Sequence, residues 1–256
     1  MNYLDLAKKS ALLAGDLLLK YLGKITSYEL KSPKSVVTEA DTRAEDLIIR
    51  TIKAACPDHG ILAEESGDNI NNAEYVWIID PLDGTTNFAH AYPFFSVSIA
   101  LEIEGVVKIG VIYDPVKKEL FSAEQGRGAY LNDKPISVSR VDDLEISHLV
   151  TGFVYEHDWM VKKNLKHFED FIYKSQAVRR DGSAALDLCY VACGRFDGFW
   201  EMGLNPWDTA AGALILREAG GVVTNFSGTE FTLDSVELLG SNKVLHEDMI
   251  KVLSSE

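Results

Sequence analysis

The 256-residue sequence has little cysteine and no long apolar run. Its three cysteines, Cys56, Cys189 and Cys193, are odd in number and show no metal-binding spacing, so a disulfide scaffold is not expected. A reducing, cytoplasmic setting fits this composition. Since no stretch reaches about 18 uninterrupted apolar residues, we expect no membrane-spanning helix.

Positive charge is also scarce. Lys and Arg total 25 against 39 Asp and Glu, which gives a formal net charge of −14. We therefore expect no nucleic-acid partner, because phosphate backbones require clustered Lys and Arg. The surplus of acid either keeps the protein soluble or gathers carboxylates that hold cations, and the motifs must decide between these. The hydrophobic content of 46% is that of a folded globular protein and excludes disorder.

The first eighty residues predict two helices and two buried strands. In residues 3–22 apolar positions recur at helical spacing with charged residues between them, which favours an amphipathic helix over a secretion signal. A second helix is expected over residues 38–56, ended by Pro57. Strands are expected at Gly60–Ala63 and at residues 76–80. Pro81 should end the second strand, because proline cannot donate to the ladder.

The remaining sequence predicts two kinds of sheet. Residues 95–138 contain short strands joined by short turns, which implies antiparallel pairing. From about residue 149 strands and helices alternate. We therefore predict one α/β (α+β) module over residues 1–256, with an approximate first half at 1–139, a second half at 140–256, and helices on the faces of the sheets.

The segment Asp80-Pro81-Leu82-Asp83-Gly84-Thr85 predicts a metal and phosphate site. Asp80 follows an apolar strand, and Asp83 lies in a turn from which it can point back. Gly84 allows close backbone approach, and free amides of Gly84 and Thr85 at the start of a helix suit an anion. Carboxylates beside such amides are expected where a cation joins them to the anion, and Mg²⁺ commonly does this with phosphate.

Two simpler or different interpretations of this segment exist. It could be a turn with ordinary capping aspartates. It could also serve a phosphoaspartate mechanism, in which two aspartates are spaced by two and the first is the nucleophile. The spacing of three and the proline after Asp80 argue against that mechanism.

Two further acidic segments are individually ambiguous. Glu64 and Glu65 follow the strand ending at Ala63 and could be solvated strand-end acids. Asn205-Pro206 has the features of a helix start, so Asp208 falls in a first turn, where the helix dipole favours a carboxylate. Neither segment is sufficient alone.

Taken together, the segments resemble a known family. Glu64-Glu65-Ser66, DPLDGTTNF at 80–88 and WDTAAG at 207–212 are similar to the E-E-S, D-P-x-D-G-T-x-N-F and W-D-x-A-A-G segments of the inositol monophosphatase family, in the same order. The similarity runs from the first helix to the last and is that of a bacterial-type member. It implies the layered αβαβα fold of the inositol monophosphatase and fructose-1,6-bisphosphatase type.

The resemblance implies a magnesium-dependent, lithium-sensitive active site. Its metal ligands would be the carbonyl of Leu82 and the carboxylates of Glu64, Asp80, Asp83 and Asp208. Two Mg²⁺ ions would neutralise these four carboxylates, which would otherwise repel one another, and a third, looser ion is expected with bound phosphate.

Further roles follow from the same resemblance. Glu64 and Thr85, supported by Asp41, would orient the attacking water, and the amides of Gly84 and Thr85 would hold the phosphate. Asp83 and Asp208 would assist the departing alkoxide. Lys31 would lie on a loop near the weakest metal.

The resemblance places substrate recognition elsewhere in the chain. The hydroxyls of a small phosphorylated polyol or sugar would be contacted by Gly182, Ser183, Ala184 and Glu201. Residues 151–158 resemble a bacterial-type substrate loop. Arg179 and Arg180 either reach a phosphate or carboxylate of the substrate or cap a strand, and capping is the simpler expectation.

The expected reaction is Mg²⁺-dependent hydrolysis of a phosphate monoester by a metal-activated water, with inositol 1-phosphate giving inositol and phosphate. Alternatives are fructose 1,6-bisphosphate, histidinol phosphate, another sugar phosphate, or 3′-phosphoadenosine 5′-phosphate, although enzymes for the last usually carry longer insertions. A catalytically idle binding protein is a different alternative, which the intact acidic set disfavours. A homodimer is expected from the family.

Overall fold

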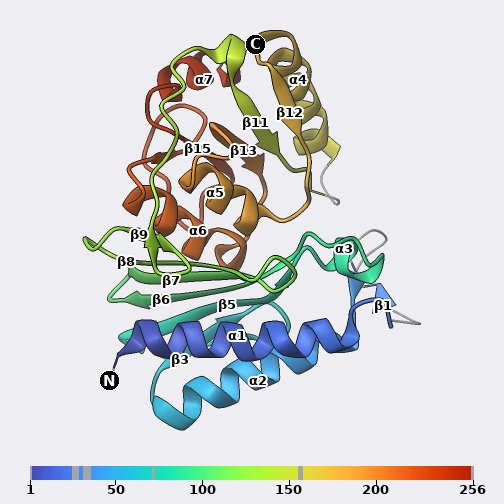
Figure 1. Ribbon diagram of the computed structural model, residues 1–256, viewed down its shortest axis with the longest axis vertical. Coiled ribbons are helices and arrows are strands. Elements are labelled where there is room, and N and C mark those ends of the chain that lie inside the picture. The colour runs from blue at the N-terminus through green and yellow to red at the C-terminus, as the bar shows by residue number, and fades with distance from the viewer. Residues whose placement is uncertain (1, 25–28, 31–35, 71–72, 155–157, 255–256) are drawn as a thin grey trace.

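The computed structural model describes residues 2–24, 29–30, 36–70, 73–154 and 158–254. Figure 1 shows helices and sheets stacked in layers. The helices α1 (Tyr3–Tyr21) and α2 (Glu39–Ala55) cover an eight-stranded sheet. The helices α5 (Ala184–Ala192) and α6 (Pro206–Glu218) separate it from a five-stranded sheet, which packs on α4 (Asp158–Lys174) and α7 (His246–Leu253). The αβαβα prediction is confirmed.

The eight-stranded sheet has the order β10-β9-β8-β7-β6-β5-β3-β4. Only β3 and β5 pair in parallel, and the other neighbours are antiparallel, as the short turns predicted for residues 95–138. The strands are β3 (Gly60–Ala63), β4 (Gly67–Asn69), β5 (Tyr75–Asp83), β6 (Ser96–Ile103), β7 (Val106–Asp114), β8 (Glu119–Glu124), β9 (Ala129–Leu131) and β10 (Lys134–Pro135). A separate two-stranded hairpin consists of β1 (Glu29–Leu30) and β2 (Val36–Val37).

The prediction that Pro81 ends its strand is wrong. Strand β5 continues to Asp83, and its pairing with β6 shifts between Asp80 and Asp83. Asp80 lies opposite Ser98, and Asp83 lies opposite Ser96. Proline removes one ladder hydrogen bond, but a bulge absorbs this loss and lets the strand resume.

The five-stranded sheet has the order β12-β11-β13-β15-β14. Its first three strands run in parallel, whereas β15 is antiparallel to both of its neighbours. The strands are β11 (His148–Thr151), β12 (Ala177–Arg179), β13 (Gly198–Met202), β14 (Val222–Thr224) and β15 (Glu237–Ser241). The 3-10 helix η1 (Leu144–Ile146) precedes this sheet, and the short helix α3 (Thr85–Ala89) follows β5.

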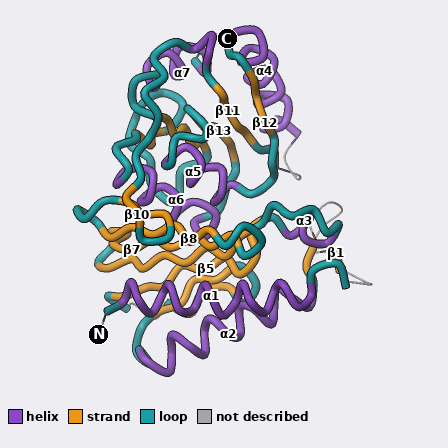
Figure 2. Tube along the Cα trace, in the orientation of Figure 1, coloured by secondary structure: helices purple, strands orange, loops and turns teal. Residues whose placement is uncertain are grey.

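The helices between the sheets are largely buried. Every residue of α5 is buried, which explains why its sequence is apolar almost throughout. Figure 2 shows α5 and α6 between the two groups of strands. A Cβ added to Gly110 of β7 would lie 2.7 Å from the carbonyl oxygen of Ala211 in α6. Gly110 therefore permits the close contact between α6 and the larger sheet.

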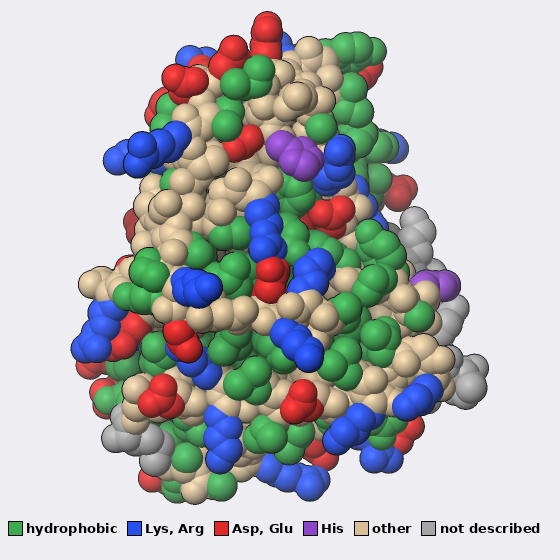
Figure 3. Space-filling model, in the orientation of Figure 1, with side chains coloured by type: hydrophobic (Ala, Val, Ile, Leu, Met, Phe, Trp, Pro, Cys, Tyr) green, Lys and Arg blue, Asp and Glu red, His purple; other side chains and the backbone are tan. Residues whose placement is uncertain are grey.

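The surface carries both signs of charge. On the face shown in Figure 3, basic and acidic side chains are interspersed over the whole height of the molecule. Among the described helices, none is long and apolar enough to cross a bilayer. The division into halves near residue 139 stays a prediction.

Candidate active site

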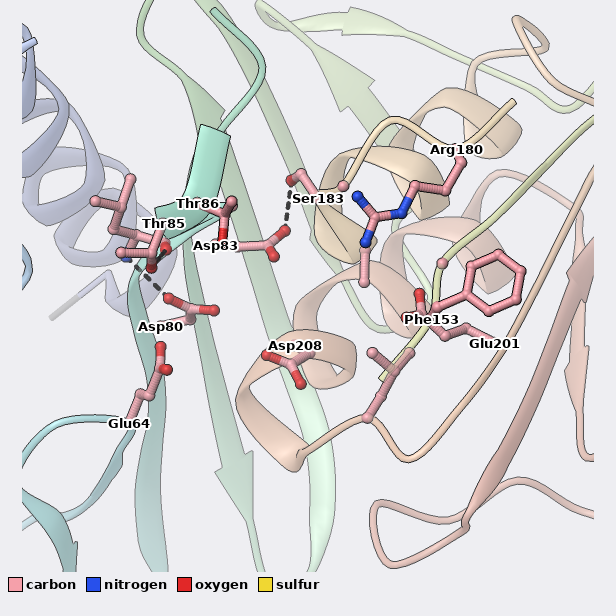
Figure 4. A pocket seen from close by; sticks show the side chains of 16 residues that line it. Glu64, Asp80, Asp83, Thr85, Thr86, Phe153, Arg180, Ser183, Glu201 and Asp208 are labelled. Carbon is pink, nitrogen blue, oxygen red and sulfur yellow. Dashed lines mark hydrogen bonds between the residues drawn. The ribbon is translucent and has the colours of Figure 1, made fainter. Parts of the chain in front are cut away.

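Three aspartates meet at one end of strand β5 in the larger sheet. Asp80 and Asp83 lie at the end of β5, and Asp208 lies in the first turn of α6. One carboxylate oxygen from each lies within 4.8 Å of the others. Figure 4 shows these side chains facing one another across a pocket. The bulge in β5 lies between Asp80 and Asp83, so it determines the relative positions of these two side chains.

The three carboxyl groups resist ionisation together. Burial, followed by the charges of Glu64, Asp83 and Asp208, raises the pKa of Asp80 well above its usual value. Burial raises the pKa of Asp83 to about 6, against hydrogen bonds that lower it. Burial and the charge of Asp83 raise the pKa of Asp208 to about 8. Such crowding of acids is relieved by cations.

Each aspartate is oriented by a donor from its surroundings. The hydroxyl of Ser183 and the amide of Ala185, at the start of α5, donate to Oδ2 of Asp83 at 2.5 and 2.8 Å. The amide of Leu82 donates to Asp80 at 2.9 Å, and the amide of Asn205 donates to Asp208 at 2.7 Å. Carboxylates held in this way by outer donors are suited to Mg²⁺, which prefers oxygen ligands in a fixed geometry.

Glu64 and Leu82 lie beside this cluster. Glu64 follows β3, lines the same pocket, and lies outside the group of three aspartates. Its charge acts on Asp80 and on Asp208. The carbonyl oxygen of Leu82 lies 3.0 Å from the hydroxyl oxygen of Thr85. All the residues predicted as metal ligands therefore line one pocket.

Thr85 connects the pocket to helix α2. Its hydroxyl also lies 3.0 Å from Oδ1 of Asp41, to which it can donate. The other oxygen of Asp41 accepts from the amide and the hydroxyl of Thr38, at 2.8 and 2.6 Å, which forms the capping box of α2. Burial raises the pKa of Asp41 to about 6, against these hydrogen bonds. Asp41 thus caps its helix and faces Thr85.

Both the backbone conformation at position 84 and the atoms around it favour glycine. Its φ is +94°, a left-handed conformation that disfavours side chains. A Cβ at this position would lie 3.1 Å from the carbonyl oxygen of Phe94 and 3.2 Å from that of Gly182. Gly84 therefore brings the start of α3 against the turn before α5. Gly84, Thr85 and Thr86 all line the pocket.

The far end of the pocket carries Glu201. This residue of β13 is 7% exposed, and a Cβ added to Gly152 would lie 2.1 Å from its Oε2. The carboxylate therefore packs directly on the α-carbon of Gly152. Burial, then the charges of Asp208 and Asp83, raise the pKa of Glu201 to about 8. Gly182, Ser183 and Ala184 also line the pocket, and Figure 4 shows Ser183 hydrogen-bonded to Asp83.

The sequence profile of the inositol monophosphatase family matches residues 2–256. The chain belongs to this family. It is 45% identical to the inositol-1-monophosphatase of Synechocystis, over 99% of this chain and 89% of the relative. It is 41% identical to the Nus factor SuhB of Pseudomonas aeruginosa, over 93% of this chain and 91% of the relative.

Solved structures of family members have the same fold. The extragenic suppressor protein SuhB of Bartonella henselae superposes with a TM-score of 0.95 at 39% identity, over 100% of this chain and 99% of that one. The inositol monophosphatase of Anabaena gives a TM-score of 0.90 at 45% identity, over 98% and 94%. Relatives of similar identity thus carry two different names, so family membership leaves the substrate open. The expected absence of nucleic-acid binding likewise stays a prediction.

The sequence does not place every lining residue of this family member. Arg180 lines the pocket, so contact with the substrate stays open for it beside the simpler expectation of strand capping. Arg179 lies outside the pocket. Thr86 and Leu204 also line the pocket and were given no role from the sequence, whereas Gly152 and Phe153, which line it too, belong to the expected substrate loop at residues 151–158. Lys31 and residues 155–157 of the expected substrate loop lie outside the described residues.

Proposed function

We propose that the chain is a Mg²⁺-dependent phosphatase that hydrolyses inositol 1-phosphate to inositol and phosphate. The group of Asp80, Asp83 and Asp208 carries this proposal, because three convergent carboxylates with raised pKa values need cations. They share one pocket with the start of α3, where phosphate can bind, and with Glu201, which can accept hydroxyl groups.

The metal set would consist of the four carboxylates and the Leu82 carbonyl, holding two or three Mg²⁺ ions. Bound Mg²⁺ lowers the pKa of water and stabilises charge on the transferring phosphoryl group. The amides of Gly84 and Thr85 would hold the phosphate oxygens. Inhibition by Li⁺ is expected because the family is lithium-sensitive.

Thr85 and Asp41 would position the attacking water. Asp41 accepts the hydrogen of the Thr85 hydroxyl, so the lone pairs of Thr85 Oγ1 are directed to accept a hydrogen bond from water. The pKa of Asp41, which burial raises to about 6, lets it take up a proton near neutral pH. Glu64 would orient the same water.

Glu201 would select the alcohol part of the substrate. A carboxylate that accepts hydrogen bonds from two neighbouring hydroxyls suits a polyol, and a site built for such bonds discriminates strongly against analogues that lack them. Fructose 1,6-bisphosphate and the other sugar phosphates remain alternatives because they would use the same metal set. The Nus factor names of several relatives keep a binding role as the alternative of another class.

Phosphate release from a substrate panel tests this proposal. Purified protein with Mg²⁺ is assayed on inositol 1-phosphate, fructose 1,6-bisphosphate, histidinol phosphate, 3′-phosphoadenosine 5′-phosphate and 4-nitrophenyl phosphate. We expect turnover to be fastest with inositol 1-phosphate and to be lost in excess chelator. Light scattering on the same sample tests the expected homodimer.

A matched pair of variants tests the site. Asp83→Asn should abolish turnover while leaving the fold intact. Asp133, whose side chain is 82% exposed, does not line the pocket, so Asp133→Asn should behave as wild type. If Asp83→Asn retains turnover within about tenfold of wild type, equal to ~1.4 kcal/mol in barrier, the metal assignment is wrong. No phosphate release from any ester would favour the binding role.

A further inference from the structure

Arg180 is the cation of the pocket. Among the described residues that line it, five are acidic and Arg180 alone is basic. It follows the last residue of β12 and is exposed at the mouth of the pocket. Figure 4 shows its guanidinium group pointing into the pocket, on the side away from Glu64 and Asp80. The metal-binding chemistry of the proposed function does not use this residue.

Helix α3, which begins where the phosphate is proposed to bind, holds the backbone next to Arg180. Asn87 in α3 donates from Nδ2 to the carbonyl oxygens of Phe94 and Asp181, both at 2.8 Å. Gly182, with a φ of +89°, completes the turn, and a Cβ on it would lie 3.5 Å from Nη1 of Arg180. The guanidinium group therefore has a defined position over the Gly182 turn.

Arg179 and Arg180 differ in environment although they are adjacent. Neighbouring residues of an extended strand point to opposite sides. Arg179 pairs with Val150 in the sheet, donates from its guanidinium to the carbonyl of Val178 at 3.2 Å, and does not line the pocket. The two arginines thus form a matched pair, one inside the pocket and one outside.

The surroundings of Arg180 favour a neutral ligand over a second anion. Burial raises the pKa values of Asp187 and Glu201, and the charge of Arg180 acts on both in the opposite sense. Glu201 and Arg180 line the same pocket, so one carboxyl group offsets one guanidinium group and leaves no surplus positive charge for another phosphate. Donor and acceptor groups side by side match a hydroxyl, which accepts one hydrogen bond and donates another.

We propose that Arg180 is a specificity-determining residue, which donates hydrogen bonds to ring hydroxyls of a cyclic polyol monophosphate while Glu201 accepts from the same or the next hydroxyl. This inference rests on the proposed phosphatase function and narrows its substrate. A neutral polyol would be preferred, and a sugar carrying a second phosphate would be disfavoured by the carboxyl groups.

Steady-state kinetics of the Mg²⁺-loaded enzyme test the role of Arg180. The variants are Arg180→Met, Arg180→Lys and the control Arg179→Met, and the substrates are inositol 1-phosphate, 4-nitrophenyl phosphate and fructose 1,6-bisphosphate. Arg180→Met should raise the KM for inositol 1-phosphate about tenfold, because a charged donor is lost. Its kcat, and both constants for 4-nitrophenyl phosphate, should stay within about twofold. Arg180→Lys should recover part of the KM, and Arg179→Met should match wild type.

Four results would overturn the inference. An equal effect of Arg180→Met on all substrates would give Arg180 a structural role. A selective loss on fructose 1,6-bisphosphate would assign the guanidinium group to a second phosphate. An unchanged KM, in an enzyme that turns over inositol 1-phosphate, would remove Arg180 from recognition and leave the proposed function standing. If the wild-type protein does not hydrolyse inositol 1-phosphate at all, the proposed function fails and the inference fails with it.

Discussion

Ser183 donates a hydrogen bond of 2.5 Å to Asp83, one hundred residues earlier in the chain. Ser183 also caps helix α5, since its hydroxyl accepts from the amide of Leu186. The residue therefore joins the start of a helix in the middle layer to an acid at the end of β5. The orientation of Asp83, and with it any metal bound there, depends on how this helix packs.

Loss of the Ser183 hydroxyl should weaken metal binding. Ser183→Ala is expected to raise the Mg²⁺ concentration for half-maximal activity about 10-fold or more, the usual effect of removing an outer partner of a metal ligand. The lost cap should also cost about 1 kcal/mol of stability. Metal titration and thermal melting measure the two effects, with Ser175→Ala, a serine at the end of α4, as the control. An unchanged Mg²⁺ requirement would show that Ser183 does not orient a metal ligand.

The metal-free protein should become less stable as the pH rises. Unfolded aspartates and glutamates titrate near pH 4, whereas in the fold burial raises the pKa of Asp208, and of Glu201, to about 8. The folded state therefore binds more protons between these values. Its added stability is fully present below about pH 4, falls as the pH rises through the window, and is gone above about pH 8.

Thermal melting in chelator, at the lower and the upper end of this window, measures that fall. The melting temperature of Asp208→Asn should exceed that of wild type at the upper pH, because the variant has no carboxylate to ionise at this position. At the lower pH the two melting temperatures should differ little. Excess Mg²⁺ should remove most of the difference. A difference in melting temperature between wild type and Asp208→Asn that does not change with pH would contradict the prediction.

Gly84→Ala should damage activity beyond its effect on the backbone. A non-glycine residue in the left-handed region costs about 1–2 kcal/mol. Gly220 has a φ of +90° and no heavy atom within 4 Å of an added Cβ, so Gly220→Ala carries the same backbone strain alone. Both variants should lose similar stability from this strain, but only Gly84→Ala should lose turnover, since its Cβ displaces the start of α3. Equal activity in the two variants would argue against Gly84 in the site.

Gly152→Ala should change substrate preference. The added Cβ would displace the carboxylate of Glu201, whose oxygen lies 2.1 Å from its position. Gly152→Ala and Glu201→Gln should both raise the KM for inositol 1-phosphate more than for 4-nitrophenyl phosphate. Gly198→Ala, on the same strand as Glu201, meets the flexible side chain of Met249 instead and should cost stability only. If both substrates are affected equally, Glu201 does not bind hydroxyls.

Local structure was largely predictable from the sequence. Strands β6 and β7 follow from β-branched runs separated by short turns, and α1 and α2 follow from apolar residues at helical spacing. The end of β5 was not predictable, because proline normally stops a strand and only the pairing partner β6 shows that a bulge continues it. The hairpin β1–β2 and strand β4 were too short to give a periodic pattern.

The sequence predicted which acidic residues belong to the site. It did not predict how the residues around the pocket are arranged in space. The three acidic segments stand out in the sequence because each combines acids with a strand end or a helix start. Nothing local distinguishes Arg180 from Arg179, since both have the same chemistry and adjacent positions. The pocket distinguishes them, because only Arg180 lies past the end of β12 and over the turn at Gly182.

The sequence by itself determined the chemistry available to this protein: which residues carry carboxylates, which strands and helices they end or begin, and which family they resemble. Only the tertiary structure decided that Asp208 joins Asp80 and Asp83, that Ser183 holds Asp83, and that Glu201 rests on Gly152. For Asp208 and Ser183 the physical reason is the packing of α5 and α6 between two sheets, which brings together groups that are a hundred or more residues apart in the chain. For Glu201 it is the pairing of β11 with β13.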